Sequence, residues 1–287
     1  MTTPQSPEPV CEVRQEAGPD HDALGTRIAA HAEIAAPLVE EVTGLRLPRR
    51  PLIRIVTDQD LLASDREYST GMLHRLRGEA YGFQLIDETE FSAALTTLDQ
   101  GAHDLIAKHN IAFACEDARM RPQVLVIASS VVYAGHGSEQ LLRTVAHELT
   151  HLAQYRASKG RAFDFSNTPY GYGQRPPGAA QPIACATSFL LEGHATWADR
   201  QVTTKLLGQP VGWADNARPP QTPCAYEDGC AFVEAAIAAL GVTTFNTVWP
   251  SLLHLCPNMT ETEDVSAWMR RAFLPTSTPT LHAAAQG

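Results

Sequence analysis

The residues best suited to chemistry are two histidines and a glutamate in the segment Thr144–Ala153, which reads TVAHELTHLA. On an α-helix His147 and His151 would lie one turn apart on the same face, because four residues turn the helix by about 400° and advance it by about 6 Å. Two imidazole nitrogens so placed can bind one zinc ion at about 2.0–2.1 Å. Glu148 would then lie beside the metal, where it could accept a proton from a bound water molecule. The spacing therefore predicts metal-assisted hydrolysis.

The residues around this motif favour a helix that packs against a core. The side of the helix away from the histidines carries an apolar stripe, as buried amphipathic helices do, formed by Leu141, Leu142, Val145, Leu149 and Leu152. Three polar side chains on such a buried helix would each need a partner, because an unsatisfied buried polar group costs about 1–3 kcal/mol. A purely structural role for the motif is therefore disfavoured.

A catalytic zinc ion needs a third protein ligand and one open position. The longer pattern HExxHxxGxxH is excluded, because Gln154 and Ala157 stand where it requires glycine and histidine. The better candidate is Glu192, within FLLEGHATWAD at Phe189–Asp199. It follows an apolar run on a predicted helix, and its small neighbours would let a second helix approach closely.

Two other residues compete with Glu192 for the third position. His194 lies two residues further on, about 200° around a helix, so it could replace Glu192 only if the local backbone were extended. Asp164 lies in the preceding loop and would make a different, aspartate-type site. Both alternatives remain open at this point.

HELTH followed about forty residues later by EGHA resembles the gluzincin zinc metallopeptidases, over roughly residues 123–240. The resemblance implies a zincin-like fold, one Zn²⁺ per chain and a peptide or protein substrate. It also implies that His147, His151 and Glu192 bind the metal and that Glu148 is the general base. In such enzymes the strand before the zinc-binding helix forms an edge that binds extended substrate.

The resemblance leaves two further roles to be assigned. Some family members orient the first histidine with an aspartate at the position where this chain has Thr196, and Asp199 is the alternative for that role. Tyr226 opens YEDGCAFV, which resembles a Y-x-x-G-x-x-F-V segment downstream of the zinc site in several such peptidases. Tyr226 is therefore the first candidate for donating a hydrogen bond to the oxyanion. Three other tyrosines compete with it: Tyr155, Tyr170 and Tyr172.

Hydrophobic periodicity predicts the elements that must position these residues. The sequence indicates strands at 51–57 and 122–130, a helix at 138–158 that carries HELTH, and a long irregular loop at 159–182. The other predicted helices cover 24–45 (with Pro37 kinking or dividing it), 58–77, 91–110, 184–207, 226–240 and 261–273. Together with the resemblance, this pattern predicts an α+β, zincin-like fold with a small sheet in the first half and a mainly helical second half. Residues 21–287 are expected to form one domain, preceded by a flexible tail at 1–20.

Composition narrows the class of protein. The chain has 287 residues, of which 44% are hydrophobic, enough for a sizeable core. Its net charge of −10 disfavours nucleic acid as a partner, since nucleic-acid binders usually present a basic surface. No apolar stretch is long enough for a membrane span. The first residues lack the features of a secretory signal, so we expect a cytoplasmic protein.

The six cysteines do not form the dense pattern of a disulfide-stapled domain. A bridge between Cys224 and Cys230 is less favoured than free thiols. Cys11 binding the metal to keep the enzyme latent is a more remote alternative. The sequence does not indicate an oligomeric state.

The favoured function is zinc-dependent hydrolysis of peptide bonds. A second hypothesis is a zinc-holding interaction domain with little turnover, and a third is a zinc hydrolase of a non-peptide amide. Glu148 argues against the second, because a structural zinc site has no use for an unliganded base.

Overall fold

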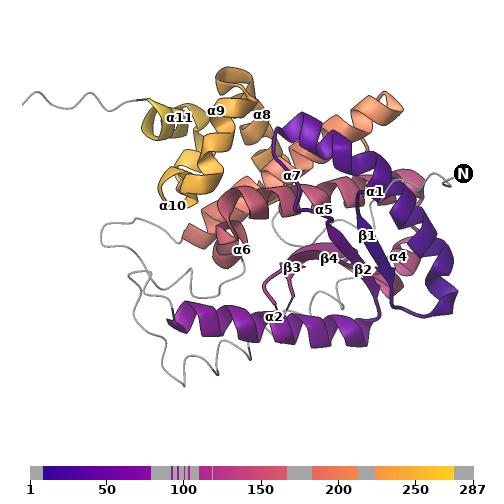
Figure 1. Cartoon of the computed structure of the whole chain (residues 1–287). Helices are drawn as coiled ribbons and strands as arrows, with labels where there is room; N and C mark the ends of the chain where they lie inside the picture. The colour runs from indigo at the N-terminus through magenta and orange to yellow at the C-terminus, as the bar shows by residue number, and fades with distance from the viewer. Residues whose placement is uncertain are drawn as a thin grey trace, which may run out of the picture.

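The computed structural model describes residues 9–78, 92, 96, 100, 103, 110–117, 119–166, 183–212 and 224–274. Within these residues the chain forms a small four-stranded sheet in its first half and is mainly helical in its second half. The predicted α+β class is therefore confirmed (Figure 1).

The sheet is mixed, with strand order β1-β2-β4-β3. β1 (Glu12–Gln15) and β2 (Leu52–Val56) are parallel, as are β2 and β4 (Pro122–Ile127). β3 (Ala112–Glu116) runs antiparallel to β4 and forms one edge of the sheet. Ile53, Ile55 and most of β4 are buried, as expected of strands covered on both faces.

Helices cover the two faces of the sheet (Figure 1). α2 (Asp58–Gly78) lies along one face, and α1 (Asp22–Thr43) and α5 (Ser138–Ser158) lie on the other. The short helix α4 (Ala128–Ala134) connects β4 to α5. α5 is therefore fixed between the sheet and the second half of the chain.

α7 (Ile183–Leu207) packs along α5 and joins the first half to the C-terminal helices. Most of its described residues from Ala186 to Val202 are buried, which places this helix inside the molecule. The elements that complete the second half are α6 (Arg161–Ser166), a π-helical segment (Cys224–Asp228), α8 (Gly229–Leu240), α9 (Val242–Phe245), α10 (Leu252–Leu255) and α11 (Val265–Phe273).

The prediction of a flexible tail over residues 1–20 is wrong for its second half. Glu12–Gln15 pairs with Leu52–Ile55, and Cys11 is 4% exposed beneath α1. Four residues, three of them polar, are too short to show a periodic signal, and only pairing with β2 makes them a strand. Residues 1–8 lie outside the described part of the chain.

Several other expectations need correction. Pro37 does not divide α1, which is continuous from Asp22 to Thr43. The loop predicted at 159–182 contains α6, and its residues 167–182 lie outside the described part of the chain, as does most of the helix predicted at 91–110. By contrast, the favoured expectation of free thiols is confirmed for Cys230, which does not bridge to Cys224.

Among the described residues, no single helix has the length and apolar character that a membrane span requires. Ala225–Leu240 and Val242–Ser251, bent by 115° relative to each other, meet both criteria only when taken together.

Candidate metal centre

α5 places three functional side chains on one face. It begins after Gly137 and ends at Lys159, whose left-handed backbone (φ 55°) stops the helix. His147, Glu148 and His151 all lie in its buried middle, with exposed fractions of 4%, 7% and 8%. The predicted helix, with its predicted boundaries, is confirmed.

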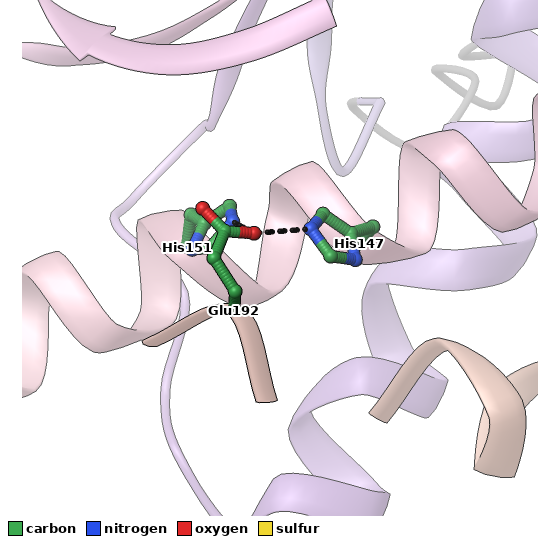
Figure 2. Close-up of side chains that lie close together, drawn as sticks. All are labelled: His147, His151 and Glu192. Atoms are coloured by element: carbon green, nitrogen blue, oxygen red, sulfur yellow. Dashed lines mark hydrogen bonds and ion pairs between the residues drawn. The ribbon is translucent and has the colours of Figure 1, made fainter. Parts of the chain in front are cut away.

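α7 brings a carboxylate to this face. Oε2 of Glu192 lies 3.1 Å from Nε2 of His147 and 3.5 Å from Nε2 of His151. Figure 2 shows the carboxylate directed at the two imidazole rings of α5. One ligand atom from each residue lies within 4.8 Å of the others, and no second group of this kind occurs among the described residues. The three predicted ligands thus come together from two helices.

A buried ion pair supports His147 from behind. Nδ1 of His147 lies 3.0 Å from Oδ2 of Asp199, and the same carboxylate accepts from Arg143 at 3.2–3.3 Å. Because Asp199 only accepts, Nδ1 of His147 carries the proton and Nε2 is left to face Glu192. Asp199 therefore occupies the orienting position that the sequence suggested for it. Thr196 is buried, and its hydroxyl has no hydrogen-bond partner among the described residues.

A different side chain supports His151, and sequence reasoning missed it. Nδ1 of His151 lies 2.8 Å from Oε1 of Gln154, which is fully buried one turn further along α5. In the sequence, Gln154 is notable only because it stands where the pattern HExxHxxGxxH requires glycine. Its spacing of three residues from His151 is the signal that could have identified it, because side chains three apart share a helix face.

The rival ligands do not join the cluster. The ring of His194 points to Gln154, with Nδ1 3.0 Å from Nε2 of that amide, and the residue is fully buried on continuous helix. The extended backbone that His194 would need to replace Glu192 is therefore absent at this position. Asp164 lies in α6, but its side chain is outside the described part of the chain.

Two glycines set how closely α7 meets the next element. A Cβ on Gly193 would lie 2.3 Å from the carbonyl carbon of Gly229, and one on Gly229 would lie 2.6 Å from the carbonyl oxygen of Phe189. The close approach expected beside Glu192 does occur, but the partner is the start of α8 rather than α5. The π-helical segment before Gly229 is thereby held against the cluster.

That segment carries Tyr226 to the cluster. Its ring stacks on His147 with centroids 6.0 Å apart, and it forms a hydrogen bond with Glu192. Burial, the negative charges of Glu192 and Glu148, and this hydrogen bond raise the pKa of Tyr226 well above its usual value. The phenol therefore stays protonated and can donate.

The other tyrosines are placed differently. The hydroxyl of Tyr155 donates to Oε1 of Glu116 at 2.5 Å and approaches the Met120 carbonyl at 3.1 Å, at the end of β3. Tyr170 and Tyr172 lie outside the described residues. Of the four candidates, the structure places Tyr226 against the cluster.

Glu148 faces the edge strand. Burial raises the pKa of Glu148, although the charges of His151 and His147 and a hydrogen bond from the backbone of Ala114 partly offset this effect. Its Oε2 atom has no hydrogen-bond partner among the described residues. The expectation that the strand preceding the zinc helix forms the edge is wrong: β4 is paired on both sides, by β2 and β3, and the edge strand next to Glu148 is β3.

The electrostatics of the cluster favour a positive charge between its three members. Burial lowers the pKa of His147, but hydrogen bonds to Asp199 and Glu192 outweigh it and raise this pKa to about 10. Burial also opposes the charge on His151, whose pKa Glu192 nevertheless raises. Burial favours the neutral form of Glu192, yet the two histidines lower its pKa. The three side chains together therefore stabilise a positive charge between them, as a site for a metal cation must.

Comparison with known proteins gives one structural relative to report. No family model matches the chain, and no curated protein sequence matches it. A solved structure from Chloroflexus aurantiacus, described as a "putative hydrolase with a novel fold", is similar over 89% of this chain and 92% of that chain. The TM-score is 0.50 and the sequence identity is 16%, so the likeness concerns the fold alone.

Proposed function

We propose that the chain is a zinc-dependent metallopeptidase of the gluzincin type. The observation that carries the proposal is the convergence of His147, His151 and Glu192 within 4.8 Å, with Glu148 beside them and not among them. Two histidines and a glutamate are a known donor set of catalytic zinc sites that keep one position open.

The surroundings of the donors fit a zinc ion. Asp199 and Gln154 occupy the Nδ1 atoms of the two histidines, so both Nε2 atoms can offer lone pairs in the neutral form. Two neutral imidazoles and one carboxylate would leave a net charge of +1 with Zn²⁺ bound. Such a net charge would favour the loss of a proton from a bound water molecule to the neighbouring Glu148.

Each residue then has a defined task. A bound zinc ion would polarise the scissile carbonyl and lower the pKa of a water molecule to about 7. With the metal held by His147, His151 and Glu192, Glu148 would accept a proton from a bound water molecule and pass it to the leaving amine, and its raised pKa makes it a stronger base for this task. Tyr226 would donate a hydrogen bond from its hydroxyl to the developing oxyanion.

The edge strand supports a peptide as the substrate. β3 is paired on one side, to β4, and its Ala114 reaches the carboxylate of Glu148. A substrate that adds an extended strand to this edge would place its backbone next to the base. The description of the structural relative as a hydrolase is consistent with this reading.

The test combines metal analysis with turnover. Purified protein is expected to hold one zinc per chain by elemental mass spectrometry and to cleave a peptide library. Glu148→Gln is expected to keep the zinc and lose turnover by at least about 10²-fold, the scale of general acid–base catalysis. His147→Ala is expected to lose stoichiometric zinc, since it removes one of three protein ligands.

Thr150→Val is the matched control. Thr150 is buried on the same helix but bonds only to the carbonyl of Ala146, so both zinc and turnover should be retained. Protein that binds no zinc, or a Glu148→Gln variant as active as wild type, would refute the proposal.

A further inference from the structure

Gln154 lies at the centre of a buried network behind His151. Its Oε1 atom is 2.8 Å from Nδ1 of His151, and its Nε2 atom is 3.0 Å from the carbonyl oxygen of Leu191 and 3.0 Å from Nδ1 of His194. One amide therefore connects a histidine of α5 with two consecutive turns of α7 on either side of Glu192.

The hydrogen-bond partners of Gln154 determine the orientation of its amide group. The carbonyl oxygen of Leu191 can only accept, so the group facing it is the NH₂ of Gln154. The oxygen of the amide consequently faces His151, which must donate from Nδ1. Neutral His151 then has its lone pair on Nε2, the atom directed at Glu192.

His194 gives the amide a second partner. In the orientation that the Leu191 carbonyl requires, the other N–H of Gln154 points at Nδ1 of His194, which accepts it, and a flip would set the amide oxygen against the Leu191 carbonyl oxygen. The imidazole is held in place by aromatic rings, with centroid distances of 5.7 Å to Trp197, 5.5 Å to Phe245 and 5.1 Å to Trp249. This enclosure fixes the ring and keeps water from the network.

The geometry points to Gln154 as a positioning residue for His151, locked by His194 and by the Leu191 carbonyl. It holds the imidazole with Nε2 toward the metal without adding a negative charge behind it. This inference rests on the proposed zinc site, and it assigns a function to two residues that the ligand set does not include.

The experiment measures zinc affinity by competition with a chelator. Gln154→Leu keeps the volume but removes the acceptor, and it is expected to weaken zinc binding at least about tenfold, the scale of losing a partner behind a ligand. Gln154→Glu keeps an acceptor for His151 but sets an oxygen against the Leu191 carbonyl, so it is expected to bind zinc less tightly than wild type and more tightly than Gln154→Leu. A long-range ¹H–¹⁵N spectrum should show the proton of His151 on Nδ1 in wild type and a loss of that preference in Gln154→Leu.

A packing role predicts the opposite order. A buried apolar side chain would then be tolerated better than a buried charge, so Leu would bind zinc as well as Gln, and Glu would bind it worse. That order would overturn the inference. Thr150→Val, which touches neither the amide nor the ligands, should match wild type.

A third variant decides the matter if Gln154→Leu does not fold. His194→Phe keeps an aromatic ring in the enclosure but removes the acceptor for Gln154, and it should weaken zinc binding relative to wild type. Affinity equal to wild type in His194→Phe would then count against the lock. Wild-type protein that binds no zinc would refute the proposed function itself, whereas wild type that binds zinc beside unaffected variants would refute this inference alone.

Discussion

The two sides of the candidate metal centre are built from different chemistry. Behind His147 lie two full charges, Asp199 and Arg143, with side chains 0% and 3% exposed. Behind His151 lies a neutral amide, Gln154, which is itself held by a neutral ring. Two ligands that the HExxH pattern presents as equivalent therefore receive unequal support. A carboxylate makes an imidazole a stronger donor than an amide does, so His147 should hold the metal more firmly.

Substitutions on the charged side, behind His147, should also lower the free energy of unfolding more than substitutions behind His151. Asp199→Ala would remove the carboxylate that pairs with the buried Arg143 guanidinium, and removing one member of a buried ion pair costs about 3–5 kcal/mol. We expect a loss of this size in the free energy of unfolding of the metal-free protein, measured by urea denaturation.

A paired variant separates the charge effect from packing. Arg143→Met combined with Asp199→Leu removes both charges and should be more stable than Asp199→Ala alone. A loss below about 1 kcal/mol in Asp199→Ala would mean that the charged side is no more demanding than an exposed ion pair.

The two sides should respond to pH in opposite directions. Although burial lowers the pKa of His147, its carboxylate partners raise this pKa from 6.5 to about 10. Its contribution to stability is therefore complete below pH 6.5 and is lost as the pH rises through 10. Burial and the charge of His151 lower the pKa of His194 from 6.5 to about 3. Its contribution is present above pH 6.5 and is lost as the pH falls toward 3.

Urea denaturation in the presence of a chelator, from pH 5 to pH 9.5, tests this prediction. Each group contributes a slope of at most about 1.4 kcal/mol per pH unit. His194→Phe should reduce the loss on the acid side and leave the alkaline side as in wild type. An acid side unchanged in this variant would show that His194 does not titrate as inferred.

The smallest effect is expected from an ion pair outside the cluster. Arg200 and Glu227 approach to 2.6 Å next to Tyr226, but their side chains are 33% and 42% exposed. Solvent screens such a pair, so Glu227→Gln should change the free energy of unfolding by less than about 1 kcal/mol. If Glu227→Gln lowered the free energy of unfolding as much as Asp199→Ala, the exposed ion pair would contribute as much to stability as the buried one, which would contradict the prediction.

The parts of the site that could be predicted are those carried by helical periodicity. The boundaries of α5 follow from its apolar stripe, and Glu192 follows from a lone acidic residue in a buried helix. Gln154 could not be recognised in the same way, because its role depends on Leu191 and His194, which only the packing of α7 on α5 brings near.

The parts of the fold that could not be predicted depend on pairing between distant segments. β1 is a strand because Val13 lies opposite Ile53, and nothing within the four residues of β1 indicates this. β3 likewise depends on β4 across a turn, and it rather than β4 proved to be the edge. Local patterns carry no information about which strand will be outermost.

The contact between Gly193 and Gly229 has a consequence for the sequences that can adopt this fold. Neither position has room for a methyl group, which would meet the backbone of Gly229 in one case and the carbonyl oxygen of Phe189 in the other. A substitution at one cannot be relieved by changing the other, because both are already the smallest residue. The segment before Gly229 would have to move away, and Tyr226 would leave His147 with it. A related chain that keeps this arrangement should therefore have glycine at both positions, which makes the pair a more selective signature of it than HExxH alone.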